Sequence, residues 1–239
     1  MPLRGLSSMA TKAVLADLAT RVSRSGPEVV VESAGGVAVA HRLREGERAD
    51  LVVLAHESIV GLAGESVVVP GSIRPLFRSE AVLAIPSDAP TPGIATRSEV
   101  IAALAAAHRI GYSTGPSGDA LLLRLSEWGL RPGLEDRLVQ TRPGVSVARL
   151  LADGGADIGV QQRSEFAGVD GVRVLGALPA DCAITTVFTA AVLSCSTRPD
   201  AAAAVIAGLA DAAYDPVVRS HGLERPQPSD GHPVYCSAR

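Results

Sequence analysis

The sequence predicts an α/β protein built from two doubly wound lobes. Short runs of β-branched residues alternate along the chain with stretches rich in Ala and Leu, a pattern that favours parallel sheets covered by helices. The chain has 239 residues, 47% of them hydrophobic. That length accommodates two lobes of about 100 residues each, both with a sizeable core.

The expected elements follow from these runs in chain order. The first helix is expected at residues 9–22, where Val14, Leu18 and Val22 recur every fourth position and form an apolar stripe. Further helices are expected at residues 37–44, 98–107, 117–128, 146–151 and 199–213. Strands are expected at residues 29–32, 51–54, 81–85, 109–113, 158–161, 172–175 and 185–192. Residues 86–92, with three prolines, and residues 131–133 are expected to be surface connections.

Composition excludes several classes of function. The net charge is −3 and no run of Lys or Arg occurs, so a nucleic-acid partner is not expected. The three cysteines and five histidines lack metal-ligand spacing, which predicts no metal site. Gly-x-Ser-x-Gly, GxGxxG and GxxxxGK[ST] motifs are absent, so we expect no nucleotide or nicotinamide cofactor and no hydrolase nucleophile elbow.

Two further observations concern location. No uninterrupted apolar run approaches about 18 residues, so no membrane span is expected. The first residues lack the apolar stretch and small-residue cleavage site of a secretory signal. The sequence as written therefore predicts a cytoplasmic protein, or a periplasmic or extracellular one if an export signal precedes Met1.

Three helices are expected to begin directly after small, polar or glycine-containing loops. A helix N-terminus offers unpaired N–H groups and a partial positive charge, so converging N-termini can hold an anion without Lys or Arg. The alternative is that serines such as Ser8 and Ser117 are N-caps with no ligand. The candidate anion-binding residues of these loops are Ser7, Ser8, Gly35, Gly36, Ser113, Thr114, Gly115, Ser117 and Gly118.

Four stretches of the sequence resemble a known family: GLSSMATKAVLADL, VESAGGVAVAHRLREGERADLVVLAHESIVGLAG, IGYSTGPSGDALLLRLSEWGL and LADGGADIGVQQRSEF. In order and spacing they resemble the molybdate-type substrate-binding proteins of ABC importers, over about residues 5–223. The resemblance implies two lobes of the periplasmic-binding-protein type, joined by crossings near residues 79–83 and 184–187. It places residues 1–80 and 187–223 in one lobe and 81–186 in the other. The prolines after His221 predict a flexible tail at residues 224–239.

The resemblance also implies an oxyanion in the cleft between the lobes. Ser8 matches the first-loop serine of the family, whereas Gly36 stands where a second serine is usual. Residues 115–118 match a turn whose amides face the anion. Gln162 falls where a tyrosine is common, with Gln161 beside it. An amide carries donors and an acceptor, so these two residues can contact a protonated or carboxylic ligand.

Other side chains have competing interpretations. Arg78, beside Ser79 at the first crossing, can bind a carboxylate with its planar fork, or it can be a solvated surface group or form a salt bridge between lobes. Tyr112 either lines the cleft or fills the core at a strand end. The carboxylates Glu32, Glu80, Glu127 and Glu165 are interpreted as solvated surface groups.

Two functions remain open. The first is a binding protein for a small anion, an oxyanion or a carboxylate, with an ABC permease as partner if the chain is exported. The second is an isomerase of a small unsaturated polycarboxylate, because the resemblance extends to relatives of the aconitate isomerase type. That reaction needs a general base, and the sequence candidates are Tyr112, Glu80 and His41.

Overall fold

The computed structural model describes residues 1–142 and 144–227. Its described strands form one network in the order β2-β1-β3-β9-β4-β7-β5-β6, with β8 paired to β4. The strands are β1 (Leu3–Ser8), β2 (Val29–Ala34), β3 (Leu51–Ala55), β4 (Arg74–Pro86), β5 (Ile110–Tyr112), β6 (Leu138–Gln140), β7 (Ile158–Gln162), β8 (Val172–Ala177) and β9 (Thr185–Val192).

Helices cover both faces of this network. The α-helices are α1 (Lys12–Val22), α2 (Gly36–Arg44), α3 (His56–Gly64), α4 (Arg97–Ala106), α5 (Pro116–Glu127), α6 (Arg131–Leu134), α7 (Val147–Ala152), α8 (Pro199–Leu209) and α9 (Asp215–Ser220). The 3-10 helices are η1 (Met9–Thr11), η2 (Pro70–Ser72), η3 (Glu135–Arg137), η4 (Arg163–Glu165), η5 (Ala180–Cys182) and η6 (Ala212–Tyr214).

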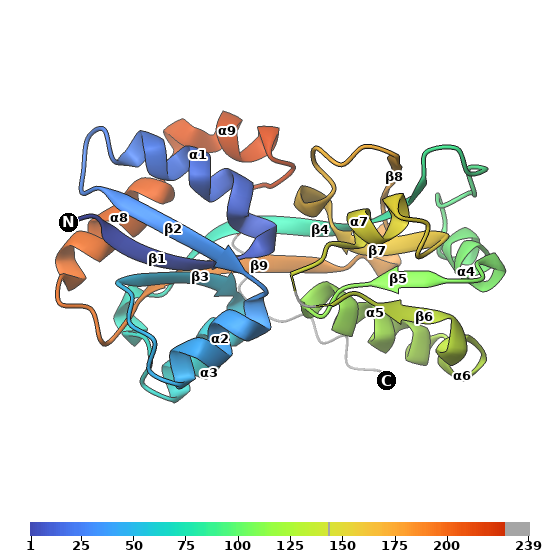
Figure 1. Ribbon diagram of the computed structural model, residues 1–239, viewed down its shortest axis with the longest axis horizontal. Helices are drawn as coiled ribbons and strands as arrows, with labels where there is room; N and C mark the ends of the chain where they lie inside the picture. The colour runs from blue at the N-terminus through green and yellow to red at the C-terminus, as the bar shows by residue number, and fades with distance from the viewer. Residues whose placement is uncertain (143, 228–239) are drawn as a thin grey trace.

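The long strand β4 belongs to both lobes. Its first part pairs with β9 as far as Glu80, and from Ala81 onward it pairs with β7 and β8. The partner change therefore falls inside the first expected crossing. The second passage between lobes leads from η5 into β9, where the Ala81 N–H donates to the Ile184 carbonyl over 2.8 Å. Figure 1 shows β4 and β9 running side by side between the two halves.

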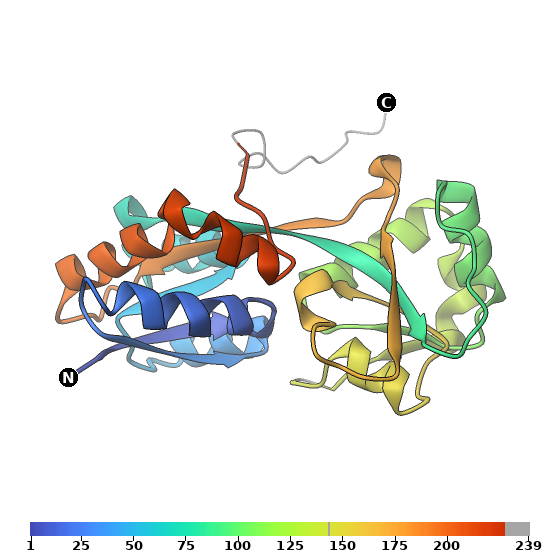
Figure 2. The ribbon, with the colours of Figure 1, turned by 90° about the horizontal axis from the view of Figure 1, so that it is seen from above.

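In the first lobe, alternate residues of the strands fill cores on opposite faces of the sheet. Leu51 and Val53 pack with α1, α8 and α9, while Val52 and Leu54 pack with α2 and α3. Successive side chains of a strand point to opposite faces, so an uninterrupted apolar strand is buried on both. Figures 1 and 2 show these two helical layers.

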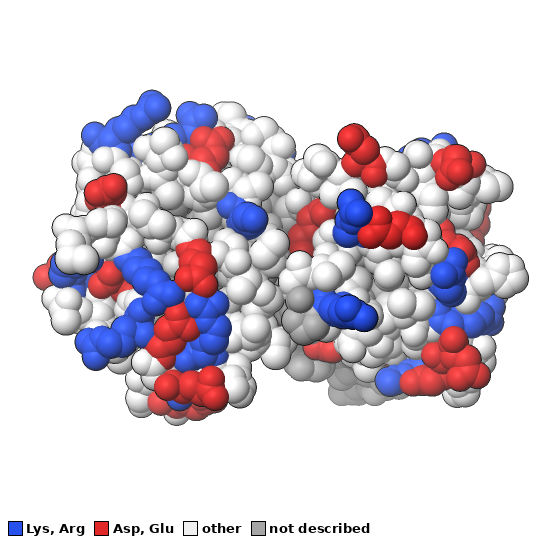
Figure 3. Space-filling model, viewed as in Figure 1, with Lys and Arg blue, Asp and Glu red and all other residues white. Residues whose placement is uncertain are grey.

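In the second lobe, alternate strand residues also fill cores on opposite faces of the sheet. Leu83 and Ile85 of β4 share a core with residues of α4 and α5, whereas Val82 and Ala84 pack against α7 and Phe166. Figure 3 shows acidic and basic side chains interspersed over both lobes on the viewed face, as the nearly balanced composition predicts. The exact lobe boundaries, 1–80 with 187–223 and 81–186, stay a prediction.

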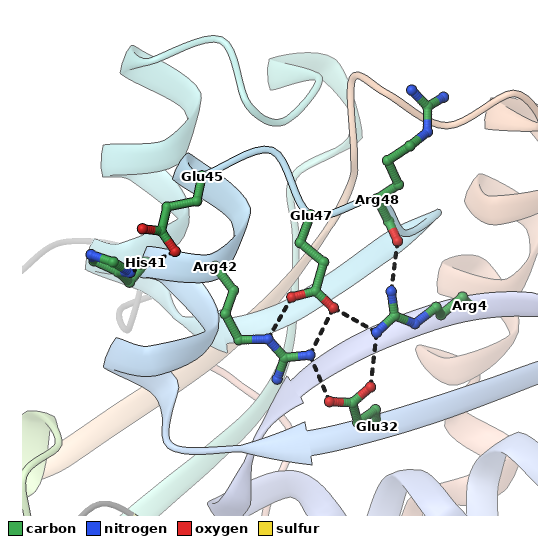
Figure 4. A network of polar contacts seen from close by, with 7 residues as sticks. All are labelled: Arg4, Glu32, His41, Arg42, Glu45, Glu47 and Arg48. Atoms are coloured by element: carbon green, nitrogen blue, oxygen red, sulfur yellow. Dashed lines mark hydrogen bonds and ion pairs between the residues drawn. The ribbon is translucent and has the colours of Figure 1, made fainter.

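Four charged residues tie the turn between β2 and α2 to its surroundings. Glu32 of β2 and Glu47 each accept hydrogen bonds from both Arg4 and Arg42, as Figure 4 shows. The two guanidinium groups lower the pKa of Glu47 to about 2. Because Glu32 precedes Gly35 and Arg42 follows Gly36, this network, Arg4–Glu32–Arg42–Glu47, holds both ends of that turn.

Several expected elements were wrong or missing. Residues 3–8 form β1, so Ser7 and Ser8 end a strand, and α1 begins only at Lys12 after η1. This strand depends on parallel pairing with both β2 and β3, which its short local pattern does not reveal. α3 and β6 were not expected, and residues 131–133 belong to α6 instead of an irregular connection.

The prediction of a flexible tail was wrong for its first two residues, Glu224 and Arg225. Glu224 exchanges two backbone hydrogen bonds with Arg78 of β4. The Arg225 side chain donates to Asp215 and to the carbonyls of Leu76, Leu209 and Asp211. These bonds anchor the chain at residues 224 and 225, because four hydrogen bonds from one guanidinium group reach β4, α8, α9 and Asp211. Residues 228–239 of the expected tail lie outside the described residues.

Within residues 1–142 and 144–227, no single helix is long and apolar enough to cross a membrane. One bent pair, Pro199–Leu209 with Ala212–Ser220, passes that test jointly. The buried residues of α8, among them Val205 and Ile206, pack in the core of the first lobe.

Candidate ligand-binding cavity

A cavity lies where the carboxyl ends of parallel strands from both lobes meet. β1 and β2 end at Ser8 and Ala34 on one side, and β5 and β7 end at Tyr112 and Gln162 on the other. Crevices at the carboxyl ends of parallel strands are the usual ligand sites of open α/β sheets. The cavity measures about 590 Å³, including the solvent at its mouth.

The first lobe contributes Ser8, Gly35 and Gly36 to the cavity lining, with Met9 and Ala10. Ser8 is also an N-cap, since its Oγ accepts from the Ala10 N–H over 3.4 Å. Ser8 therefore both caps η1 and lines the cavity. A Cβ on Gly36 would lie 3.7 Å from Ser8 Oγ and from Leu54, which is ordinary contact.

The second lobe contributes the loop between β5 and α5, with Ser113, Thr114, Gly115 and Ser117 in the lining. Ser113 Oγ lies 3.1 Å from Ser117 Oγ and accepts from the Gly115 N–H over 3.4 Å. The N-cap of α5 is Gly115, so the alternative role of Ser117 as N-cap was wrong.

Gln161 and Gln162 lie at the end of β7 and both line the cavity. Gln161 Oε1 accepts from the Val147 N–H at the start of α7 over 2.6 Å, which orients its amide unambiguously. Gln162 Nε2 donates to Thr186 Oγ1 over 2.7 Å. Gln162 Oε1 is buried and has no hydrogen-bond partner among the described residues.

Glu165 is the one acidic or basic residue in the described lining. Its Oε2 accepts from Gln161 Nε2 over 2.7 Å. Burial beside the cavity raises the pKa of Glu165 to about 7, because removing water disfavours the ionised carboxylate. The interpretation of Glu165 as a solvated surface carboxylate was wrong, since the exposure of its position depends on the facing lobe.

Four candidate ligand residues lie outside the described lining. Ser7 is fully buried and shares a 2.7 Å hydrogen bond with Ser33. Gly118 lies under its own loop, where a Cβ would overlap the Ser113 carbonyl oxygen. Arg78 forms salt bridges with Glu80 and Glu224, and neither partner lies in residues 81–186, the predicted second lobe. Ser79 is 1% exposed, and its Oγ has no partner among the described residues.

The three general-base candidates also lie outside the lining. Tyr112 packs at the edge of the second lobe's core, Glu80 is bound by Arg78, and His41 is exposed on α2 beside Glu45. Sequence reasoning missed several residues that do line the cavity: Met9, Ala10, Pro116, Thr141, Gly144, Val145, Ser146, Glu165 and Phe188. The Gly144–Val145–Ser146 stretch precedes α7 and has the same pattern as the three predicted loops, namely glycine and serine directly before a helix.

This arrangement favours binding of negative charge. The N-termini of the 3-10 helix η1 and of the α-helices α2 and α5 reach the cavity through Ser8, Gly35 and Gly115. Their first N–H groups have no partner within the helix and carry partial positive charge. Serine hydroxyls add donors that can rotate toward a ligand, and the glutamine amides add donors whose orientation is fixed by hydrogen bonds.

Comparisons with known proteins bear on the fold and the family of this chain. The aconitate isomerase of a Pseudomonas species is 27% identical over 190 residues, which cover 78% of this chain and 71% of that protein. The periplasmic molybdate-binding protein of Azotobacter vinelandii superposes with a TM-score of 0.78 at 19% identity, over 94% of this chain and 100% of the other. The sulfate-binding protein of Mycobacterium tuberculosis superposes with a TM-score of 0.75 at 15% identity, over 96% and 88%.

The two structural likenesses confirm the predicted fold of two periplasmic-binding-protein-type lobes. The sequence profile of the bacterial extracellular solute-binding proteins matches residues 3–224, which is nearly all of the described chain. A small-molecule ligand follows from that membership. The chain belongs to the bacterial extracellular solute-binding protein family.

Proposed function

We propose that this chain binds a small anion, a carboxylate or an oxyanion, in the cavity between its lobes. The observation that carries the proposal is the meeting of three helix N-termini, from both lobes, at one cavity whose described lining has no lysine or arginine. Oriented N–H groups in a partly dehydrated space stabilise negative charge without a cation.

The two-lobed construction supports a binding role because contacts from both lobes form together only when the lobes close. Ser8 comes from the first lobe, while Ser113 and Gln162 come from the second. An ABC permease is the partner that we propose for a family member of this kind. The permease needs an exported chain, so a periplasmic or extracellular location is part of this proposal.

A thermal-shift panel tests the binding function. The ligands are molybdate, tungstate, sulfate, phosphate, citrate, and cis- and trans-aconitate. A ligand at about 100 times its dissociation constant stabilises the folded state by roughly 2.7 kcal/mol, which moves the midpoint by a few degrees. A shift with one or more of these anions supports the proposal. The proposal fails if no anion in the panel raises the midpoint.

The second candidate is isomerisation of an unsaturated polycarboxylate. One specific observation favours it: the cavity contains Glu165, whose pKa of about 7 suits a group that both takes and returns a proton. The Pseudomonas relative is named for such a reaction. Glu165 takes a proton from the carbon beside the double bond, and the released electron pair delocalises into the conjugated carboxylate. The double bond moves, and the proton returns to the other end of the allylic system.

Proton NMR in deuterium oxide separates this reaction from simple binding. With trans- or cis-aconitate, an isomerase replaces carbon-bound protons by deuterium and produces the other isomer. A binding protein leaves both signals unchanged. The Glu165→Gln variant provides the matched control, because an amide cannot accept the proton.

A further inference from the structure

Glu165 presents an unusual group to an incoming anion. Gln161 holds one oxygen of the carboxyl, and the Gln161 amide cannot turn over because its own Oε1 accepts from Val147. Glu165 Oε1 accepts no hydrogen bond from the described residues. The carboxyl is therefore fixed at the cavity with one oxygen left for a ligand.

The charged residues around Glu165 do not neutralise it. β4 and η1 pack against η4. Glu80 of β4 is bound to Arg78, and Lys12 beyond η1 is exposed. On η4 itself the Arg163 stem lies against Gly222, and Arg142 near the cavity mouth is exposed. None of these groups forms an ion pair with Glu165 within the described residues, and the only cause of its raised pKa is desolvation.

An ionised carboxylate only accepts hydrogen bonds. If the bound anion also has only acceptors, the two groups face each other without a proton between them and repel. An anion that carries its own O–H satisfies Glu165 instead, through a charge-assisted hydrogen bond. An acceptor that meets no donor in this partly dehydrated cavity also loses hydration that no hydrogen bond replaces.

We propose that Glu165 makes this cavity selective for anions that bring a hydrogen-bond donor of their own, such as hydroxycarboxylates or hydrogen-bearing oxyanions, over anions that have acceptors only. This inference rests on the proposed anion-binding function and names the class of ligand within it. Gln161 acts as a positioning residue, since it holds Glu165 and orients its free oxygen.

Two matched pairs of probes test the inference. Citrate and tricarballylate differ by one hydroxyl group, and monohydrogen phosphate and sulfate are tetrahedral dianions that differ by one proton. Dissociation constants are measured by titration calorimetry at about pH 8, where Glu165 is mostly ionised, for the unchanged chain and for Glu165→Gln. Glu28 is exposed and its side chain forms no ion pair with the described residues, so Glu28→Gln supplies a control variant.

The unchanged chain and Glu28→Gln should bind the donor-bearing member of a pair at least about tenfold more tightly. The ratio should fall to about threefold or less in Glu165→Gln, whose amide donates to either member. At about pH 5.5 protonated Glu165 can itself donate, so the acceptor-only member should regain affinity in the unchanged chain and not in Glu165→Gln.

Equal affinities within every pair that binds, or the same ratio in Glu165→Gln as in the unchanged chain, overturn the inference and leave the anion-binding function standing. If none of the four probes binds while molybdate, tungstate or an aconitate does, the inference is overturned, because those anions carry acceptors only. If no probe binds and no anion of the thermal-shift panel raises the midpoint, the anion-binding function fails and the inference fails with it. The two kinds of failure are distinct because only the last result shows no anion binding.

Discussion

The Ser164 hydroxyl donates a hydrogen bond across the two lobes to the Ala10 carbonyl, over 2.7 Å. Ser164 lies on η4 of the second lobe, next to Glu165. Ala10 lies on η1 of the first lobe, two residues after Ser8. Neither end of this bond depends on a ligand. The bond therefore favours the closed arrangement in which both halves of the cavity lining face each other.

Replacing Ser164 by Ala should weaken ligand binding about two- to tenfold by removing one closing hydrogen bond. Ser164 is outside the described lining, so the loss reflects closure and should be seen mainly as faster dissociation. Stopped-flow release of a ligand found in the thermal-shift panel measures this rate. Ser126→Ala, which removes only a local bond within α5, is the control. Equal rates in both variants contradict the closing role.

Ser8→Ala should reduce anion affinity by about fivefold to tenfold, because one hydroxyl of the lining is lost. Its capping bond is long, so stability should fall by only about 1 kcal/mol or less. Ser7→Ala is the matched control, since Ser7 hydrogen-bonds to Ser33 behind the cavity. It should lower stability and leave affinity unchanged. Calorimetric titration together with urea unfolding separates the two effects, and the reverse pattern would remove Ser8 from the site.

Gly118→Ala should destabilise the fold by about 2 kcal/mol or more, because its Cβ would overlap the backbone oxygen of Ser113. Gly115→Ala is the control, since its Cβ would meet only Ser113 Oγ, at 3.9 Å. The measurement is thermal unfolding, which compares the midpoints of Gly118→Ala and Gly115→Ala. Similar midpoints would show that the loop moves freely.

Glu165→Gln should make the protein more stable at about pH 8 and nearly equal to the unchanged chain below about pH 5. The pKa of Glu165 is raised to about 7, so the folded state keeps a proton that the unfolded chain releases near pH 4.5. Stability therefore falls as the pH rises between these two values, by roughly 3 kcal/mol at most. Urea unfolding across this range measures the difference, with Glu28→Gln as the surface control. Parallel profiles for all three proteins would mean that the Glu165 carboxyl is not desolvated.

Arg42→Gln should cost about 1 kcal/mol or less, because the network of Arg4, Glu32, Arg42 and Glu47 is partly exposed. The cost should shrink at about 1 M salt, where exposed charges are screened. Arg149→Gln breaks one exposed pair with Asp153 and should cost less at low salt. Urea unfolding at two salt concentrations tests this, and a salt-independent cost would exclude an electrostatic origin.

The sequence predicted the elements whose pattern is local. β3 and β9 are apolar runs between turns, and α4 and α5 follow from helical stretches after a capping residue or a proline. β1 was missed because its two parallel neighbours stabilise it. α3 was missed because its apolar residues continue directly from β3, and local periodicity does not separate the two.

For the site, the sequence by itself predicted three of the loops that carry donors, because serine, glycine and a following helix are local features, although it missed the loop at residues 144–146. It also determined the amide pair at Gln161 and Gln162, which lines the cavity. Only the tertiary structure decided the role of each charged group. Glu165 loses its water because the facing lobe covers it, and Arg78 is bound because Glu80 and Glu224 reach it from different segments. Desolvation and ion pairing depend on which surfaces meet in space, and residue spacing along the chain carries no record of that.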